Sequence, residues 1–208
     1  MGKNLELVIK SFPDKYYKLI NDVNLNTSLG DFSGVLDGNG YKITSESKTN
    51  IIFASNIGTV KNLTANCRLA KTNTESGVVE NCVFNNTYRI IGTNDGLIKN
   101  SKCINGELNL EYSSSGYINS AISDYGFAGE NSATGEIIGC DFVCDKMNIN
   151  VTSRGATYTF GVIACENAGK ISECYSKFDM EYCFSDNTYG RLFCGIAINT
   201  GDNAVIEN

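Results

Sequence analysis

The sequence predicts an all-β fold, a right-handed parallel β-helix in which about seven coils stack into a solenoid. Three observations support this prediction. A segment of the type Gly-x-Ile/Val-x-Asn-Cys recurs from the first third of the chain to its end. Its first two steps are 19 residues each. Residues after each copy alternate in character, which is typical of a strand with one buried face.

The recurring segment has six copies. They are residues 58–63, 77–82, 96–101, 135–140, 169–174 and 204–208. The steps between their first residues are 19, 19, 39, 34 and 35 residues, so one coil needs about 19 residues and longer steps carry excursions. We expect these excursions at residues 112–129, 153–160 and 182–192.

Stacking explains why such short strands would be stable. One short strand cannot bury its apolar face alone, whereas parallel rungs about 4.8 Å apart pair their backbones and enclose one interior. The alternative is a β-sandwich with irregular hairpins, but its usual Asn-Gly and Asp-Gly turns recur rarely here.

Each motif position has an expected role. Glycine should supply a backbone conformation that the corner needs, and the β-branched residue should point inward. The asparagine should adopt left-handed dihedral angles and hydrogen-bond to its counterpart in the next coil. This predicts an asparagine ladder through Asn62, Asn81 and Asn100, interrupted by Gly139 and Glu173.

The last motif position predicts a buried column that contains thiols. Two columns should form, the first with Leu63, Cys82, Ser101, Cys140 and Cys174, the second with Ala65, Phe84, Cys103, Phe142 and Ser176. A free cysteine in such an apolar setting behaves as a small hydrophobic residue. We therefore expect most or all of the nine cysteines to be reduced and slow to react. Only Cys140 and Cys174 share a column on adjacent rungs, close enough to form a bridge if their side-chain geometry allows it.

The first sixty residues contain two further strand patterns. Residues 16–25 read Tyr-Tyr-Lys-Leu-Ile-Asn-Asp-Val-Asn-Leu, and residues 32–43 read Phe-Ser-Gly-Val-Leu-Asp-Gly-Asn-Gly-Tyr-Lys-Ile. With the later repeats, the chain resembles pectin-lyase-like solenoids and the GLUG-type repeats of bacterial surface proteins and adhesins, over residues 16–208. This resemblance implies the fold but no single function, since such helices carry lyases, hydrolases, adhesins and phage tailspikes alike.

We expect one β-helix domain over residues 1–208, with an N-terminal cap over 1–15 and coils over 16–208. Leu5, Leu7 and Ile9 alternate, which favours a strand that covers the first coil, and a helical cap is the alternative. The chain stops inside a repeat and starts without a secretory signal. We therefore expect part of a longer protein, extracellular or at the cell surface, with a cytoplasmic protein as the alternative.

Charge and hydropathy argue against several partners. The net charge is −6, and the lack of a Lys and Arg cluster makes nucleic acid or an anionic membrane an unfavourable partner. The longest apolar runs, 161–165 and 193–198, are far shorter than the roughly 20 residues that span a bilayer. No phosphate-binding glycine loop occurs, and Cys140 and Cys144 lack the second close pair of a zinc site. We expect no cofactor.

The sequence offers little catalytic chemistry. It contains no histidine, which removes the commonest general base and every Ser-His or Cys-His arrangement. A polysaccharide hydrolase would need paired carboxylates. The candidates are Asp141, Asp145, Asp179, Glu181 and Asp202. Their positions in the sequence do not suit a catalytic pair on one outward face.

Other charged residues have plainer interpretations. We interpret four arginines as isolated, solvated residues and not as the basic residue of a lyase: Arg68, Arg89, Arg154 and Arg191. Residues 37–40, Asp-Gly-Asn-Gly, offer two oxygen-bearing side chains, but a tight turn is favoured over a calcium site. We predict no catalytic and no metal-binding residue.

The one candidate ligand-binding region is aromatic. Tyr112, Tyr117, Tyr125 and Phe127 lie in or beside the Ser-rich excursion, and inserted loops on a solenoid commonly carry recognition. The alternative, which we favour, is that this excursion closes over the core, with Ile118, Ile122 and Phe127 as apolar anchors.

The repeats and the missing catalytic chemistry predict a non-catalytic binding or structural module. The resemblance implies that it belongs to a bacterial surface protein, adhesin-like, whose partner we expect to be a glycan or a protein at a host or cell surface. Two alternatives remain open. One is a carbohydrate-active β-helix, such as a tailspike-like depolymerase or a lyase. The other is an intracellular acidic rod that inhibits another protein.

Overall fold

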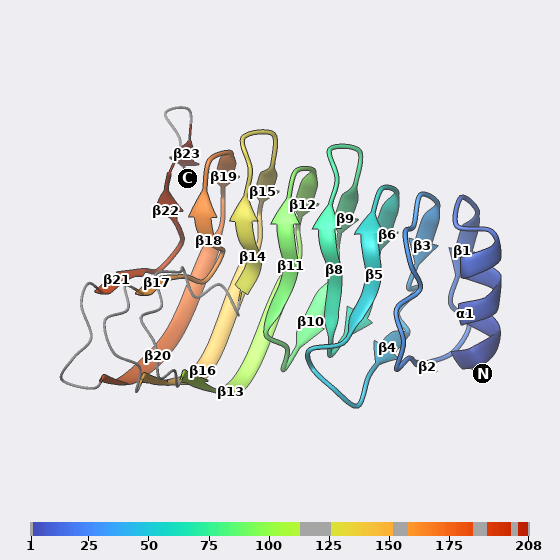
Figure 1. The fold of residues 1–208 in the computed structure, drawn as a ribbon. Coiled ribbons are helices and arrows are strands. Elements are labelled where there is room, and N and C mark those ends of the chain that lie inside the picture. Colours follow the sequence, from blue (N-terminus) through green and yellow to red (C-terminus); the bar gives the residue numbers. More distant parts are fainter. Residues whose placement is uncertain (1, 113–125, 152–157, 185–190, 201–203, 208) are drawn as a thin grey trace.

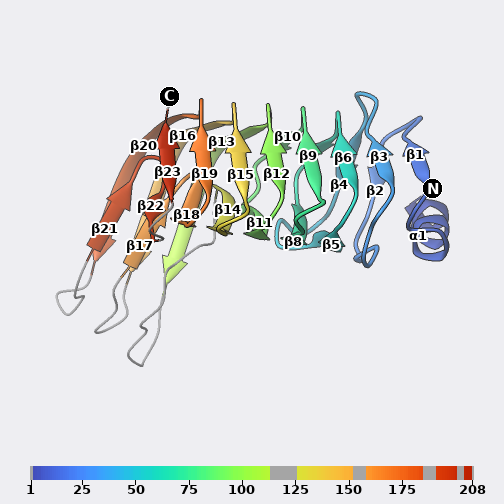
Figure 2. The same cartoon turned by 90° about the horizontal axis from the view of Figure 1, so that it is seen from above.

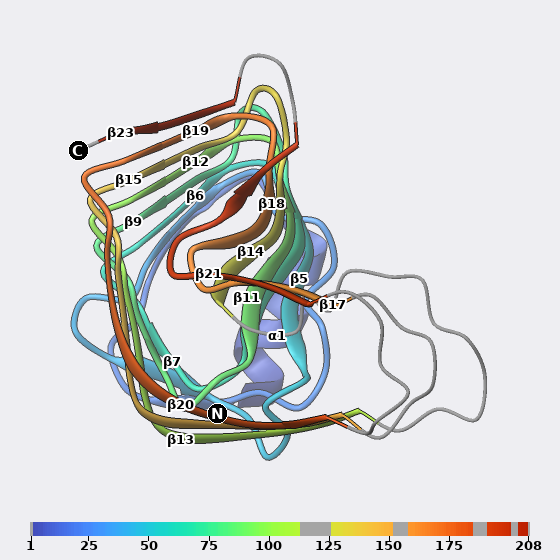
Figure 3. The same cartoon turned by 90° about the vertical axis from the view of Figure 1, so that its left-hand side faces the viewer.

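The computed structural model describes residues 2–112, 126–151, 158–184, 191–200 and 204–207, and its architecture is the predicted parallel β-helix (Figure 1). Three parallel sheets, here called A, B and C, run along the axis, and successive coils contribute strands to them in turn. Viewed from the C-terminal end, the chain runs counterclockwise toward the viewer through sheets A, B and C, so the helix is right-handed (Figure 3).

Sheet A is built from the recurring motif. Its strands are β1 (Tyr16–Lys18), β3 (Val35–Asp37), β6 (Thr59–Lys61), β9 (Val78–Glu80), β12 (Leu97–Lys99), β15 (Glu136–Ile138), β19 (Lys170–Ser172) and β23 (Val205–Glu207). The motif copies pair in register, so that Val60, Val79 and Ile98 align and are fully buried. The predicted stacking is confirmed, and each long step in the sequence is a single coil.

Sheet B follows sheet A in every coil. Its strands are β2 (Val23–Asn24), β4 (Lys42–Thr44), β7 (Thr64–Ala65), β10 (Val83–Asn85), β13 (Lys102–Tyr112), β16 (Asp141–Val151) and β20 (Tyr175–Phe184). These seven strands agree with the expected number of coils. The last three are 11, 11 and 10 residues long and extend past the body of the solenoid (Figures 2 and 3).

Sheet C closes each coil. Its strands are β5 (Ile51–Asn56), β8 (Arg68–Asn73), β11 (Arg89–Asn94), β14 (Gly126–Asn131), β18 (Ala164–Asn167) and β22 (Ile198–Asn199). A separate parallel pair, β17 (Tyr158–Gly161) and β21 (Arg191–Cys194), precedes β18 and β22 in the last two coils.

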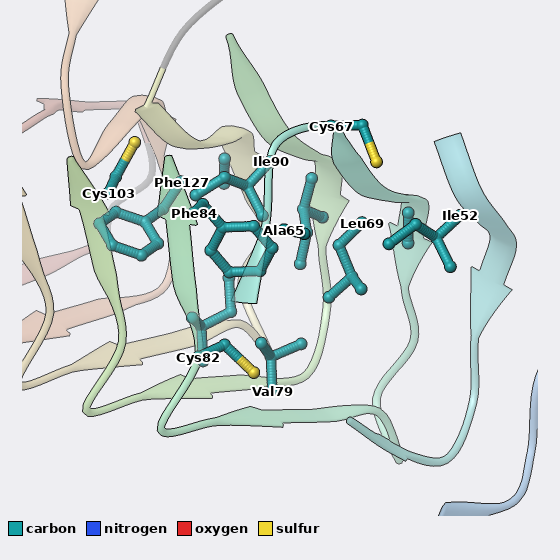
Figure 4. Packing of buried hydrophobic residues seen from close by; sticks show 14 of the residues in the cluster. Ile52, Ala65, Cys67, Leu69, Val79, Cys82, Phe84, Ile90, Cys103 and Phe127 are labelled. Atoms are coloured by element: carbon teal, nitrogen blue, oxygen red, sulfur yellow. The ribbon is translucent and has the colours of Figure 1, made fainter. Parts of the chain in front are cut away.

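The interior is a continuous apolar core in which both predicted columns are present. Ala65, Phe84, Cys103 and Phe142 pair in register on neighbouring strands of sheet B and are buried. In the other column, Leu63, Cys82, Ser101 and Cys140 are buried, and Cys174 is half-buried. Figure 4 shows Cys82, Phe84 and Phe127 among the side chains that fill this interior.

A helix covers the first coil. Helix α1 (Gly2–Ser11) lies at the N-terminal end of the solenoid (Figure 1). Ile9 is fully buried and Leu5, four residues earlier, packs against the core, whereas Leu7 is 66% exposed. The expected strand is therefore wrong, because Leu5 and Ile9 share one helical face, and the helical alternative is the one found.

The corner between sheets A and B uses the left-handed backbone that the motif predicts. Asn62, Asn81 and Asn100 have φ angles of 52°, 53° and 49°, and Gly139 and Glu173 occupy the same region with 61° and 54°. The predicted side-chain ladder is wrong. These asparagines are exposed, and within the described residues no hydrogen bond joins their amides; Asn62 Nδ2 donates instead to an Asp37 oxygen, at 3.1 Å.

A buried asparagine ladder lies at the other end of the coil, where sheet C leads to sheet A. Its members are the last residues of five successive strands and are 0% exposed: Asn56, Asn73, Asn94, Asn131 and Asn167. The Nδ2 of each of the first four donates to the Oδ1 of the next asparagine, over 2.7, 2.8, 2.7 and 2.7 Å. The side chains thus join the coils through a continuous row of hydrogen bonds.

The motif glycines are needed for space and not for an unusual φ. None of the five lies among the glycines with positive φ in the described chain. A Cβ at Gly77 would meet the Asn73 side-chain oxygen and the Asn56 carbonyl oxygen. The expectation that these glycines supply a special backbone conformation is therefore wrong, since their role is to let the ladder asparagine and the neighbouring coil approach.

Candidate functional site

The predicted aromatic site is only partly described. Tyr117 and Tyr125 lie outside the described residues. The backbone of Tyr112 ends β13, in register with Val151, and its side chain is not described. Phe127 is 0% exposed and lies near Phe84 and Ile90 in the core (Figure 4). Phe127 is therefore an apolar anchor, as the closure alternative expects, and its side chain is not a surface available to ligand.

The described surface offers a different candidate, a groove across the outer face of sheet C. Its volume is about 430 Å³, within the range of small-molecule sites. It crosses strands β5, β8, β11, β14 and β18, which lie side by side in Figure 1. The lining residues are Ile51, Arg68, Lys71, Thr72, Arg89, Gly92, Thr93, Gly129, Glu130 and Glu166.

Two glycines form the floor of this groove. A Cβ at Gly92 would collide with the Lys71 carbonyl oxygen. A Cβ at Gly129 would lie 2.8 Å from Arg89 Nη1 and 2.9 Å from the Gly92 carbonyl oxygen. The Arg89 side chain therefore lies over a strip of bare backbone. A larger residue at Gly129 would fill the groove and displace the guanidinium group.

Positively and negatively charged side chains line different parts of the groove. Arg68 and Arg89 begin strands β8 and β11, which are adjacent rungs, while Glu130 and Glu166 pair in register on β14 and β18. Both arginines are half-buried. The interpretation of Arg68 and Arg89 as isolated, solvated residues is wrong, because stacking brings together residues that are 21 positions apart in the chain. Thr72 and Thr93, paired in register, add hydroxyl groups.

Several carboxylates meet on the outer face of sheet B. Asp145 on β16 and Asp179 and Glu181 on β20 line one shallow depression of about 410 Å³, together with Lys146. Lys146 Nζ contacts a Glu181 carboxylate oxygen at 3.0 Å. Asp202 is outside the described residues. The structure therefore brings together three of the carboxylates that the sequence suggested.

The remaining candidates have structural roles. Residues 37–40 form a tight turn, in which an Asp37 oxygen accepts from the Asn39 backbone N–H at 2.9 Å and Asn39 has a φ of 51°. In the described part of the chain no three His, Cys, Asp or Glu side chains cluster as metal ligands would. Nor does that part include a helix long and apolar enough to cross a membrane.

The thiols are mostly in the core. The structure describes the side chains of eight cysteines and shows no disulfide between them; Cys67, Cys82, Cys103, Cys140, Cys144 and Cys165 are buried, Cys174 is half-buried and Cys183 is exposed. Burial raises the pKa of the Cys67, Cys82 and Cys103 thiols to about 12. Because the thiolate is the reactive form, slow reaction of these residues remains a prediction with a clear physical cause.

No protein-family model, curated protein or solved structure matches this chain. The fold is therefore established by the strand pairing alone, and function has to be inferred from the surface of the described residues.

Proposed function

We propose that this chain is a non-catalytic β-helical module of a bacterial surface protein, adhesin-like, that binds a glycan in the groove on sheet C. The observation that carries the proposal is the bare floor at Gly92 and Gly129, flanked by charged and hydroxyl side chains. A sugar ring carries many hydroxyl groups, which guanidinium, carboxylate and threonine side chains can bind as donors and acceptors.

The strands support such a site well. Every lining residue belongs to sheet C, whose strands pair on both sides from β8 to β18. Sites on paired strands hold their side chains more precisely than sites on loops. The Asn ladder at the end of these same strands adds hydrogen bonds between coils. The groove is therefore preorganised, which lowers the entropic cost of binding.

The test is a glycan array with the wild-type chain, followed by calorimetry of the best ligand with an Arg68→Gln/Arg89→Gln variant. Loss of one or two charge-assisted hydrogen bonds should weaken binding about tenfold or more. Lys102→Gln on the outer face of sheet B, where Lys102 pairs with Asp141, is the matched control and should bind normally. Absence of any glycan ligand, or equal binding by the groove variant, would reject the proposal.

The carboxylate depression on sheet B favours a second candidate, a carbohydrate-active enzyme. Glycosidases use two carboxyl groups on either side of the scissile bond, and Asp145, Asp179 and Glu181 share one depression. Reducing-end assays on acidic and neutral polysaccharides test it directly. Turnover that Asp179→Asn abolishes would establish the enzyme, while no turnover on any polysaccharide would leave the binding module.

A further inference from the structure

Cys140 and Cys174 occupy the same corner of two successive coils. On one side Ile138 pairs with Ser172, and on the other Asp141 pairs with Tyr175. The register therefore places the two cysteines directly beside each other. Neighbouring strands are about 4.8 Å apart, which lies within the Cα separation that disulfides span.

The Cys174 sulfur lies against the backbone of the sixth coil, whereas the Cys140 sulfur points back toward the fifth coil, where it lies 3.8 Å from the Ile98 carbonyl oxygen. A bond between the two sulfurs therefore requires the Cys140 side chain to rotate to another χ1 rotamer. The Cys140 backbone N–H donates to Cys174 Sγ, with 3.4 Å between nitrogen and sulfur, so the Cys174 side chain points back toward the sixth coil. The equivalent serine behaves in the same way, because the Cys82 N–H donates to Ser101 Oγ at 3.2 Å. The orientation is thus a property of this corner.

Within the described residues, no other rung pairs two cysteines. Cys103 stands beside Phe142, Cys144 beside Phe178 and Cys183 beside Asn150. Cys103 and Cys144 are diagonal neighbours on β13 and β16, a relation that separates Cα atoms by about 7–8 Å, beyond the reach of a disulfide. These two buried thiols provide an internal control.

The two thiols differ in pKa and in exposure. Hydrogen bonding by Cys140, whose backbone N–H donates to the Cys174 sulfur, lowers the pKa of Cys174, whereas burial raises the pKa of Cys140 well above its ordinary value. Cys174 is also the more exposed of the two, since it lies in the seventh coil next to Tyr175, which is 53% exposed. A thiolate at Cys174 is therefore accessible to a small oxidant.

We propose that Cys140 and Cys174 form an oxidation site, which a small disulfide such as glutathione disulfide converts into a bond between the sixth and seventh coils. The Cys174 thiolate attacks one sulfur of the oxidant and releases one thiol. The Cys140 thiol then loses its proton and attacks the Cys174 sulfur, releasing the second thiol. The protein dithiol is oxidised by two electrons, and one oxidant disulfide is reduced to two thiols.

The location gives this bond a physical consequence. Ile171 on β19 is 1% exposed, whereas Ile206, its partner on β23, is 41% exposed, so the last rungs are less well covered than the interior ones. Segments with few buried contacts open most readily. A covalent link between the two coils should therefore reduce local opening at this end of the rod.

Incubation of the folded chain with glutathione disulfide tests the proposal. Exposed Cys183 would form a mixed disulfide of its own, so a Cys183→Ser background is used. Before alkylation, mass spectrometry of the intact chain should find a mass lower by two hydrogens. After denaturation and alkylation, two fewer thiols should carry the alkyl group, and a peptide should link residues 140 and 174. Hydrogen exchange of β19 and β20 should slow after oxidation.

Cys140→Ser and Cys174→Ser should each abolish the link, and Cys103→Ser should leave it intact. If a serine variant fails to fold, the peptide map of the chain that retains both cysteines still shows whether the link forms. A glutathione adduct that persists on Cys174 without ring closure, a link to any other cysteine, or no loss of thiols would overturn the proposal.

Discussion

The two asparagine corners of this β-helix use the same residue for opposite physical reasons. At the corner between sheets A and B, Asn62, Asn81 and Asn100 are exposed and have positive φ. At the corner between sheets C and A, asparagines such as Asn94 are completely buried and joined through their amides. One corner needs a residue that tolerates left-handed dihedral angles; the other needs a side chain that both donates and accepts.

The difference extends to the glycines beside each corner. Gly40, in the turn after β3, has a φ of +81° and open space around its Cβ position, whereas the space at Gly77 is already filled by the ladder. The positive φ explains why residue 40 is glycine, and the close approach of neighbouring atoms explains why residue 77 is glycine. Substitutions at the two corners should therefore fail for different reasons and by different amounts.

The largest effect is expected at Gly77. In Gly77→Ala the new methyl group collides with a ladder side chain and with backbone of the neighbouring coil. Overpacking together with loss of ladder hydrogen bonds should lower the free energy of unfolding by about 3–5 kcal/mol. Urea denaturation followed by circular dichroism measures it. Gly40→Ala, the control, should cost only about 1–2 kcal/mol through its φ; equal costs would contradict the distinction.

The next largest effect is expected in the ladder itself. Asn94 accepts from Asn73 and donates to Asn131 and to the Gly96 carbonyl oxygen. Asn94→Ala leaves buried polar groups unpaired on both sides, which should cost about 2–4 kcal/mol. The same urea titration tests this, and Asn94→Gly should be no better than alanine.

Asn56, at the start of the ladder, makes fewer side-chain hydrogen bonds than Asn94 and tests whether the loss of stability follows their number. Its Nδ2 donates to Asn73, but its buried Oδ1 has no hydrogen-bond partner among the described residues. Asn56→Ala should therefore cost less than Asn94→Ala. A larger loss at Asn56 would show that the ladder does not act through paired hydrogen bonds.

The sequence predicts the exposed corner and misses the buried one for a definite reason. The motif places Asn62, Asn81 and Asn100 at a constant four residues after its glycine, so a fixed alignment reveals them. Asn73 precedes its glycine by four residues but Asn94 by only two, so the ladder column is blurred. Buried asparagine is also uncommon, which favours interpreting such residues as solvated turns.

The groove on sheet C could not be predicted from the sequence for the same reason. Arg68 lies ten residues after Gly58, whereas Arg89 lies twelve after Gly77, because the bend between sheets B and C varies in length. The sequence therefore predicts the columns of sheets A and B, which follow the motif closely. Sheet C, which carries the groove, could be aligned only from its strand pairing.

A thiol beneath the exposed corner provides a pH-dependent comparison. Cys82 follows Asn81, and burial raises its pKa from 9.0 to about 12. The folded state therefore keeps a proton that the unfolded state loses above pH 9, so the stability from this group is complete below pH 9 and declines up to pH 12. Between pH 8 and 11 the wild type should lose roughly 2 kcal/mol more than Cys82→Ala, measured by urea titration. Identical losses would show that the thiol does not resist ionisation.

The smallest effect is expected at Asn81, where the backbone and not the amide should decide the outcome. Its φ of 53° disfavours alanine, so Asn81→Ala should lower the free energy of unfolding by about 1 kcal/mol. Asn81→Gly restores access to this region and should lie within a few tenths of a kcal/mol of wild type. Thermal and urea denaturation of both variants would test this. A glycine variant as unstable as the alanine variant would mean that the amide does bond between coils, and that the two corners differ less than their burial indicates.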